Sequence, residues 1–309
     1  MKKRVLVFPC GSEIGLELHN SLRYAKEVEL FGGTSVADHG EFVYANCIDK
    51  IPHVEADNFV DSLNAVIDSF RIDYVFPAHD SVVLKLALAA KQRQLACEVV
   101  TSPFETCRIC RSKWLTLNLY AKILRTPSVY ENPDEIRDWP VFLKPDIGQG
   151  SKGTAKADNL DECVLLLRQN PSLLILEYLP GAEYTVDCFT DRNRRLIFVG
   201  VRERTRIQNG ISVNTKPVHD PAAKAIAMKI IVVLELRGMW FFQLKRAADG
   251  DLALMEIAPR LAGGMGMYRN LGVNLALMSP SACGWTIAIF FPSSEQYSMI
   301  RNKKGSLKR

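Results

Sequence analysis

The sequence lacks any long hydrophobic run. No stretch of this 309-residue chain approaches the roughly 20 apolar residues that a membrane-spanning helix needs. The basic start, MKKR, is followed by only four clear apolar residues, Val5 to Phe8, before turn residues begin. That run is too short for the core of a signal peptide. These absences predict a cytoplasmic protein with no membrane partner.

Most of the chain also lacks excess charge of one sign. The net charge is +5, but the last nine residues, RNKKGSLKR, hold five basic residues and no acid. Without these five, 34 basic residues stand against 34 acidic ones. A neutral body with a short basic tail argues against nucleic-acid binding, which needs a basic patch or stripe.

Paired cysteines at zinc-binding spacing are missing. The eight cysteines are at positions 10, 47, 97, 107, 110, 163, 188 and 283. Cys107 and Cys110 form one CxxC, with no second pair and no thioredoxin-like context. The cysteines are therefore predicted to be reduced thiols and not a metal or redox site.

Alternating strand and helix patterns fill the first 105 residues. Strand patterns cover 5–8, 28–33, 42–51 and 73–78, and helical patterns cover 14–22, 57–70 and 81–94. Strands that alternate with helices predict βαβ units and a parallel sheet. Gly11 and Gly15 lie at the first strand-to-helix turn, where either ligand binding or plain turn geometry accounts for them.

The rest of the chain has a different pattern. A helix is predicted over 111–124, with Trp114, Leu117 and Ala121 on one face, and another after the capping residues Asp158 and Asn159. Strand patterns at 183–190 and 195–205 predict an antiparallel pair. A final hairpin is predicted over 239–259, turning at Asp249 and Gly250, after a helix at 221–236.

A glycine loop, KPDIGQGSKGT, spans 144–154 and contains a literal G-x-G-x-x-G. A dinucleotide-binding loop must open a helix directly, yet TAKAD follows the last glycine and the helix begins only near Asn159. A Walker loop needs Gly-Lys, and that pair is absent from the chain. What remains is a loop between two hairpin strands, either a solvated turn or a cover over phosphates.

Charged residues downstream favour the phosphate interpretation. Three acids, Glu177, Glu183 and Asp187, surround one strand-turn-strand unit. Three arginines, at 202, 204 and 206, alternate along one strand and are expected on one face. Gln243 and Glu256 fall on the two arms of the predicted hairpin, and oxygen ligands on neighbouring strands suit Mg²⁺ bridged to phosphates.

This ordered set resembles the ATP-grasp superfamily, in the branch similar to the large subunit of carbamoyl-phosphate synthase. The most specific segments are KPDIGQGSKGT, LEYLPGAEYTVD and MEIAPR, and the resemblance runs from the N-terminus to about Asn274. It implies an α/β protein: a parallel, Rossmann-like pre-ATP-grasp domain at 1–105, then a two-lobed α+β ATP-grasp fold. The small lobe with its lid would be 106–178, and the C-terminal lobe with the metal and phosphate site 179–309.

The resemblance also implies roles for single residues. Lys113 and Lys144 would bind phosphates, the lid would cover them, and Glu183 would hold the ribose hydroxyls. Gln243 and Glu256 would bind Mg²⁺ or Mn²⁺, with Gln243 also near the nucleotide. The lid residues are Gly148, Gly150, Ser151, Lys152 and Gly153, and the adenine hinge is Glu177, Tyr178 and Leu179. Arg260 and one or more of the arginines at 202, 204 and 206 would neutralise the transferring phosphate, together with Lys144.

The chain departs from the family pattern at one metal position. Many members read Glu-x-Asn-Pro-Arg, whereas this chain reads EIAPR with Ala258 in place of the asparagine. Water, Asn270 or Asn274 would then substitute, or a second metal would be weak or lost. The segment after Ser279 is a further departure, with a helix break expected at Pro280 and no function placed in the tail.

Three further residues are candidates for substrate contact. Arg269, in the segment GGMGMYRNLG, is weighed equally as a carboxylate-binding group and as a packing residue. His79 and Asp80 lie at a strand end, where a helix cap by Asp80 or Ser81 is the favoured alternative to substrate contact.

The implied activity is an ATP-dependent, ADP-forming ligase that joins a small carboxylate to an amine through an acyl phosphate, with a homodimer as its expected assembly. One alternative is an ATP-binding subunit of a split synthase with little ligase activity. The other is an NAD-dependent oxidoreductase, which has only the two glycine patterns in its favour. The acid and the amine are left open.

Overall fold

The structure is a computed structural model, and it describes residues 2–36, 38–208 and 210–282. The first described unit is a parallel sheet in the order β3-β2-β1-β4-β5. Its central strands are apolar because helices cover both faces, and Val5, Leu6 and Val7 are fully buried. The strands are β1 (Lys3–Phe8), β2 (Val28–Gly33), β3 (Cys47–Ile48), β4 (Tyr74–Pro77) and β5 (Glu98–Val99), and the helices are α1 (Glu13–Leu22), α2 (Gly40–Val43), α3 (Phe59–Phe70) and α4 (Asp80–Lys91).

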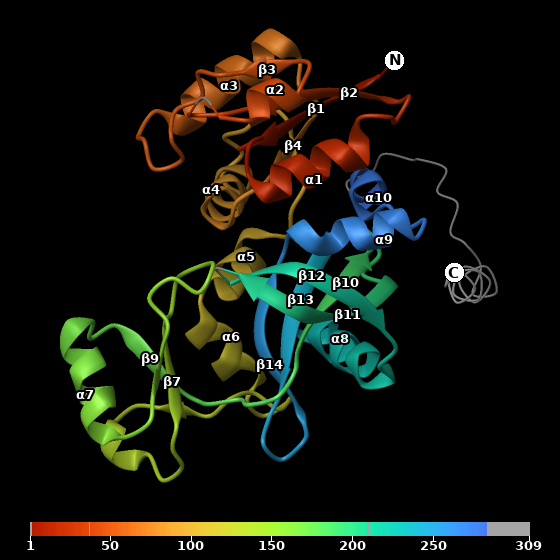
Figure 1. Ribbon diagram of the computed structural model, residues 1–309. Helices are drawn as coiled ribbons and strands as arrows, with labels where there is room; N and C mark the ends of the chain where they lie inside the picture. Colours follow the sequence, from red (N-terminus) through yellow and green to blue (C-terminus); the bar gives the residue numbers. More distant parts are fainter. Residues whose placement is uncertain (1, 37, 209, 283–309) are drawn as a thin grey trace.

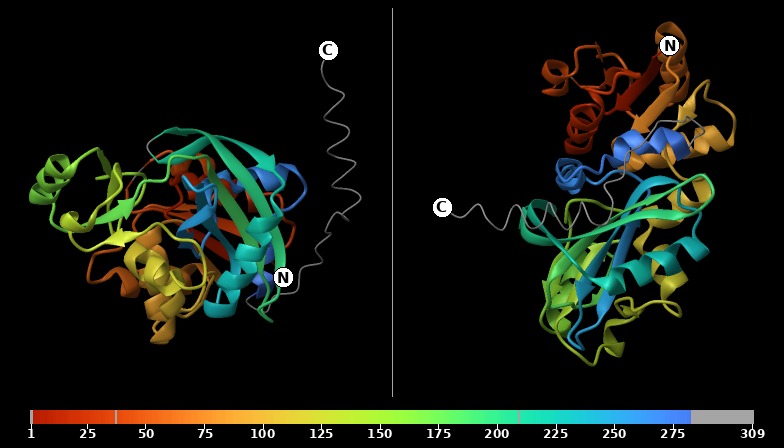
Figure 2. Two further views of the ribbon diagram at one scale, coloured as in Figure 1. Left: turned by 90° about the horizontal axis from the view of Figure 1, so that it is seen from below. Right: turned by 90° about the vertical axis from the view of Figure 1, so that its right-hand side faces the viewer.

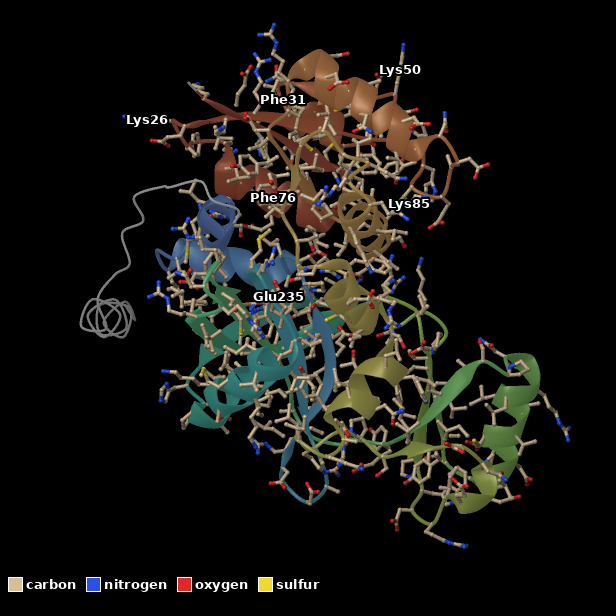
Figure 3. The ribbon with its side chains drawn as sticks, turned by 180° about the vertical axis from the view of Figure 1, so that it is seen from behind. Lys26, Phe31, Lys50, Phe76, Lys85 and Glu235 are labelled. Atoms are coloured by element: carbon tan, nitrogen blue, oxygen red, sulfur yellow. The ribbon has the colours of Figure 1, made fainter. Side chains whose placement is uncertain are left out.

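In this unit the apolar side chains point into the core and the charged ones point to the surface, as Figure 3 shows from behind. Phe31 and Phe76 lie inside, whereas Lys26, Lys50 and Lys85 project outward. The prediction of a strand over 42–51 is wrong for the first residues of that range. Residues 40–43 form the short helix α2, and only Cys47 and Ile48 pair with β2. The apolar residues of that segment alternated too briefly to separate a strand from a helical turn.

A four-stranded antiparallel sheet in the order β6-β9-β7-β8 forms the second unit. The glycine loop connects β7 to β8, which confirms its predicted place in a hairpin. The elements are α5 (Phe104–Arg111), α6 (Lys113–Tyr120), β6 (Val129–Tyr130), η1 (Pro133–Glu135), β7 (Val141–Pro145), β8 (Ala155–Ala157), α7 (Leu160–Gln169) and β9 (Leu173–Glu177). Asn159 caps α7 by accepting a hydrogen bond from the amide of Glu162, as its type predicts.

The helix predicted over 111–124 is wrong in its extent and its face. α5 ends at Arg111, and Ser112 caps the new helix α6 by accepting from the amide of Leu115. Trp114 is exposed, whereas Leu117 and Tyr120 are buried. The Tyr120 hydroxyl donates to the carbonyl of Ile230 at 2.9 Å, so a tertiary contact sets which side of α6 faces inward.

The third unit is an antiparallel sheet in the order β12-β11-β10-β13-β14. Both predicted hairpins are confirmed, since β10 pairs with β11 and β13 pairs with β14. Its elements are β10 (Glu183–Thr190), β11 (Leu196–Gln208), β12 (Ile211–Val218), α8 (Pro221–Val233), β13 (Gly238–Arg246) and β14 (Leu252–Ala258), followed by η2 (Gly263–Met265), α9 (Gly266–Asn270) and α10 (Leu275–Ala282).

The last helices join the first and third units. α9 and α10 lie between the parallel sheet and the C-terminal sheet in both Figure 1 and Figure 2. One apolar cluster holds Leu18 and Leu22 of α1 together with Tyr268, Met278 and Phe241. The break expected at Pro280 is not found, because α10 continues to Ala282. The tail from residue 283 lies outside the described residues.

No helix within the described part of the chain combines the length and the apolar character needed to cross a membrane. The described cysteines are free, in agreement with the prediction of thiols.

Candidate active site

One row of side chains crosses the C-terminal sheet. Arg202 pairs with Thr185, Thr185 with Gln243, and Gln243 with Glu256, on β11, β10, β13 and β14 in turn. Directly opposed residues of antiparallel strands point to the same face. The row therefore presents a guanidinium, a hydroxyl, an amide and a carboxylate to one side of the sheet.

Two adjoining cavities lie against this face. We call the first, between β7, β9 and the β13–β14 hairpin, the inner cavity; its volume is about 160 Å³. The second, which extends to the parallel domain, is the outer cavity, with a volume of about 1000 Å³. Gln243, Glu256, Lys113, Arg204 and the glycine loop line both. The two spaces therefore meet at the carboxylate end of the row.

Gln243 and Glu256 are the candidate metal ligands. The Gln243 Oε1 atom accepts a hydrogen bond from Arg204 Nη1 at 2.9 Å. Among the described residues, no group of three or more His, Cys, Asp or Glu side chains could hold a metal alone. Mg²⁺ commonly takes one or two protein ligands and completes its shell with water and phosphate oxygens. One carboxylate and one amide oxygen on neighbouring strands fit that requirement.

Two lysines face Glu256 from the small lobe. Lys144, on β7, is 5% exposed, and burial lowers the pKa of its ammonium to about 8 although Glu256 acts in the opposite direction. Lys113 opens α6, donates to the carbonyl of Asp146 at 3.0 Å, and also has its pKa lowered by burial. Two desolvated ammonium groups beside one carboxylate leave uncompensated positive charge, which suits a polyphosphate.

The glycine loop, residues 148–153, reaches across the cavities. Gly150, Ser151 and Gly153 all have positive φ, a conformation that glycine adopts readily and serine rarely. Arg111 Nη1 donates to the carbonyl of Gly148 at 3.2 Å. At the turn after β11, a Cβ added to Gly210 would lie 2.4 Å from the carbonyl carbon of Gly150. The loop is thus packed against the turn that faces it.

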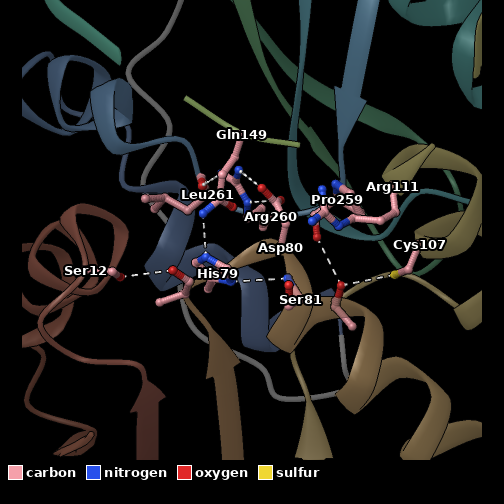
Figure 4. Close-up of polar contacts among 12 residues, drawn as sticks. Ser12, His79, Asp80, Ser81, Cys107, Arg111, Gln149, Pro259, Arg260 and Leu261 are labelled. Atoms are coloured by element: carbon pink, nitrogen blue, oxygen red, sulfur yellow. Dashed lines mark hydrogen bonds and ion pairs between the residues drawn. The ribbon is translucent and has the colours of Figure 1, made fainter. Parts of the chain in front are cut away.

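The loop also touches the parallel domain. Gln149 Nε2 lies 2.7 Å from His79 Nε2, and the His79 side chain caps α4 through its other ring nitrogen, which accepts from the amide of Ser81 (Figure 4). Burial lowers the pKa of His79, so the neutral ring is favoured. The predicted cap by Asp80 or Ser81 is wrong, because the preceding histidine fills that position.

Asp80 instead binds Arg260. Arg260 donates to both carboxylate oxygens, at 2.5 and 2.8 Å, and both residues line the outer cavity (Figure 4). Burial by itself would raise the pKa of Asp80, but the charge and hydrogen bonds of Arg260 outweigh it and hold that pKa below its ordinary value. The pair joins β14 to the start of α4 across 180 residues of sequence.

The predicted hinge residues line the inner cavity. Glu177, Tyr178 and Leu179 follow β9 into that space. The Glu177 carboxylate accepts hydrogen bonds from Arg125 at 2.8 and 2.5 Å and is therefore not available to a ligand. Glu183 also lines the inner cavity, where it forms ion pairs with Arg204 and, at 3.9 Å, with Lys245.

The three arginines of β11 do not share one environment. Arg202 is 2% exposed and donates from Nε to Asp187 at 2.7 Å. Arg204 contacts Glu183, Gln243 and the carbonyl of Gly210. Arg206 lines neither cavity, and the pairing register shifts on both sides of it. The expectation of one common face is therefore wrong for Arg206, because a β-bulge interrupts the alternation.

Three candidates lie away from the cavities. Arg269 donates to both carboxylate oxygens of Glu17 on α1, at 2.8 and 3.3 Å, so it is a packing residue. Asn270 accepts from Arg269, and the amide of Asn274 donates to the carbonyl of Ser21. Neither asparagine substitutes for the missing metal ligand, because neither lines the site. Ala258 does line the outer cavity.

Some residues around the site lie outside the motifs that the sequence analysis used. Arg111 is on α5, Lys245 is on β13, and His79, which contacts the glycine loop, lies just before α4. Asp187 was visible as one of three acids, but its buried partner on the next strand follows only from the register of β10 and β11.

Comparisons with known proteins agree with this geometry. A family model described as "ATP-grasp in the biosynthetic pathway with Ter operon" matches residues 169–283. No curated protein matches this chain in sequence.

Several solved structures share the fold. The biotin carboxylase domain dimer of Hydrogenobacter thermophilus 2-oxoglutarate carboxylase, in complex with MgADP, ADP and bicarbonate, has a TM-score of 0.76 at 12% identity, over 96% of this chain and 72% of that one. N5-carboxyaminoimidazole synthetase from Staphylococcus aureus has a TM-score of 0.74 at 15% identity, over 93% and 79% of the two chains.

An L-amino acid ligase from Bacillus licheniformis has a TM-score of 0.67 at 17% identity, over 91% of this chain and 73% of that one. These likenesses establish the ATP-grasp fold, with a parallel N-terminal sheet and two antiparallel sheets. Together with the family match they support the resemblance to the ATP-grasp superfamily.

Proposed function

We propose that this protein is an ADP-forming ligase that activates a small carboxylic acid with ATP and joins it to an amine. The observation that carries the proposal is the placement of Lys144: a buried ammonium with a lowered pKa beside Glu256 and Lys113. A fold does not hold desolvated positive charge in an apolar setting without cost, and an anionic ligand offsets that cost. The relatives of this fold whose structures contain ADP or ATP support the choice of nucleotide.

The inner cavity is the proposed nucleotide site. Lys113 and Lys144 would bind phosphate oxygens, and the loop at 148–153, with Lys152, would cover them. The backbone of Glu177 to Leu179 would hydrogen-bond adenine, and the Glu183 carboxylate would accept from the ribose hydroxyls. Since Glu183 is paired with Arg204, ribose binding requires that arginine to release it. The small volume of this cavity fits a site that opens as the loop moves.

Gln243 and Glu256 are the proposed metal ligands, since they are adjacent across β13 and β14 and face both cavities. Mg²⁺ bound there would neutralise charge on the phosphate oxygens. Ala258 offers no oxygen, so the protein supplies fewer ligands than the family pattern Glu-x-Asn-Pro-Arg.

The chemistry would take place where the cavities meet. An acid in the outer cavity attacks the γ-phosphorus through a carboxylate oxygen, and the bond to the ADP oxygen breaks. The resulting acyl phosphate then loses inorganic phosphate when an amine attacks the carbonyl carbon and gives up its proton. Arg204, which lines both cavities, and Arg260, which lines the outer one and is fixed by Asp80, would stabilise the phosphoryl group, so catalysis is mainly positioning and charge compensation.

The lid would limit hydrolysis. The glycine loop contacts both the parallel domain, through Gln149 and His79, and the β11–β12 turn, through Gly150. A loop held at two adjacent residues over the cavities would exclude water from the acyl phosphate. The same contacts support the proposed division into 1–105, 106–178 and 179–309, with the active site between the three parts.

A second candidate function is a nucleotide-binding subunit with little ligase activity of its own. Ala258 favours it, because a lost metal ligand weakens catalysis more than binding. The resemblance to carbamoyl-phosphate synthase, a cytoplasmic location and a homodimer also stay predictions.

The experiment is phosphate release from Mg-ATP in the presence of pooled carboxylic acids and amines. We expect release that requires one acid and one amine, and its loss in Lys144→Met. Lys224→Met is the matched control, because Lys224 lies on α8 with an exposed side chain and lines neither cavity. Saturable ATP binding without substrate-dependent release would favour the nucleotide-binding subunit, and an absence of ATP binding would exclude both.

A further inference from the structure

Arg202 carries an unused hydrogen-bond donor at the wall of the outer cavity. Its guanidinium donates to Asp187 from Nε at 2.7 Å and from Nη2 at 3.4 Å. Among the described residues, no atom accepts a hydrogen bond from Nη1, although that atom is buried. A buried donor without an acceptor costs free energy, and such an exception in a site is explained by a ligand that supplies the acceptor.

The position of Arg202 separates it from the phosphate-transfer machinery. It lines the outer cavity but not the inner one. In the row across the sheet it is three strands from Glu256, a separation of about 14 Å between backbones at the usual strand spacing. Its partner Asp187 pairs with Gly200 and Phe241, two residues further along the strands from the row, on the side away from Glu183. The edge of the guanidinium that carries Nε and Nη2 therefore faces away from Glu183.

Each of the other arginines at the cavity has a protein partner, although the buried Nε of Arg204 also lacks an acceptor among the described residues. Arg260 binds both oxygens of Asp80, Arg204 contacts Glu183 and Gln243, and Arg111 donates to the carbonyl of Gly148. Arg202 is also fixed in place, because Asp187 is fully buried and the guanidinium cannot leave it without stranding a carboxylate. A rigid donor of this kind recognises a planar anion with little loss of side-chain entropy.

The segment after β14 is shaped around this guanidinium. A Cβ added to Gly264 would lie 2.6 Å from Arg202 Nη1, so only glycine permits this approach. Gly264 itself lines the outer cavity. The wall of this cavity mixes apolar residues such as Ile14 and Phe241 with polar ones, Ser12, Glu13 and Thr185 among them.

We propose that Arg202 Nη1 binds a carboxylate of the substrate pair that is not the one phosphorylated. This inference rests on the proposed ligase function and adds a substrate class: one partner, the acid or the amine, carries a second carboxylate. A dicarboxylic acid and an amino acid acting as the amine present the same group. Arg202 is then a specificity residue for one of the two substrates, and not a ligand of the transferring phosphate as the family resemblance implied.

The test compares matched substrates in the phosphate-release assay with the full chain. One arm offers dicarboxylic acids beside the corresponding monocarboxylic acids. The other offers amino acids beside their amino-acid amides, which keep the amine but neutralise the carboxylate. We expect release to require the second carboxylate in one arm, and that arm identifies its source. Equal release with and without it, in both arms, overturns the inference and leaves the ligase function standing.

Variants then assign the requirement to Arg202. The double variant Arg202→Met/Asp187→Leu removes both charges together and so avoids an unpaired buried carboxylate. We expect its KM for the dicarboxylate or amino acid to rise roughly 10- to 150-fold, which is the loss of one charged hydrogen bond. We expect ATP affinity to stay within about twofold, because Arg202 does not line the inner cavity.

Two further variants keep the inference falsifiable if the double variant fails to fold. Gly264→Ala would push on the guanidinium, most strongly at Nη1, and raise the same KM without removing either charge. Arg202→Lys would restore part of the affinity, since an ammonium retains the charge but not the planar geometry. A rise in the KM for ATP, or a fall in kcat with both KM values unchanged, would overturn the assignment and place Arg202 with the phosphates. No ATP-dependent release from any pool would instead count against the proposed function.

Discussion

Replacing Lys144 with methionine should make the protein more stable while it weakens nucleotide binding. The ordinary lysine pKa is 10.5, and burial lowers that of Lys144 to about 8 in the folded protein. The unfolded chain therefore binds a proton that the folded chain has released between pH 8 and pH 10.5, so stability rises with pH across that window. Below pH 8 the difference of 2.5 corresponds to a cost of about 3 kcal/mol.

Methionine has a similar length and no charge, so it removes that cost. We expect the free energy of unfolding in urea to increase by about 3 kcal/mol at pH 7, and by less than about 1 kcal/mol at pH 10. ATP affinity should fall roughly 10- to 150-fold, as expected for the loss of one charged hydrogen bond. The control Lys224→Met should change stability by no more than about 0.5 kcal/mol.

Two results would refute this reasoning. If Lys144→Met were less stable than the wild type at pH 7, the ammonium would be satisfied by the protein and not held for a ligand. If ATP bound with unchanged affinity, the lysine would have no part in the nucleotide site.

Three other predictions concern different parts of the site. Ala258→Asn adds an amide oxygen two residues from Glu256 on the same face of β14. The Mg²⁺ concentration for half-maximal phosphate release should therefore fall. An unchanged Mg²⁺ titration would count against a metal at this hairpin. Asp80→Asn leaves Arg260 without its countercharge and should lower the free energy of unfolding by roughly 3 kcal/mol. An unaltered urea midpoint would contradict this prediction. Gly210→Ala forces a residue with φ of 72° against Gly150, so the loop at 148–153 should become more sensitive to limited proteolysis; equal cleavage rates would show that the turn does not hold the lid.

Local patterns predicted the framework of this protein well. The parallel sheet, the two hairpins and the glycine loop between β7 and β8 follow from period-two and helical spacing with turn residues between them. Lys113, Lys144, Gln243 and Glu256 are brought to one place, as their order along the chain implied. Each of these depended on signals within a few residues of one another or on a family pattern.

The errors came from contacts that no local pattern encodes. Arg206 leaves the face of Arg202 and Arg204 because a bulge adds a residue to β11, and bulges have no strong sequence signal. Arg269 lies 252 residues from Glu17, the carboxylate that engages it. Asp80 was expected as a cap, but a long-range arginine was the stronger partner. The roles of charged residues such as Arg269 and Asp80 can therefore be assigned only once the packing of α9 and α4 is known.

The most direct test of the central claim is phosphate release from Mg-ATP by the wild-type protein, measured across pools of carboxylic acids and amines. The proposed ligase predicts release that rises only when one acid and one amine are present together, and that disappears in Lys144→Met. Release that is independent of both substrates, or a Lys144→Met variant with full activity, would contradict it.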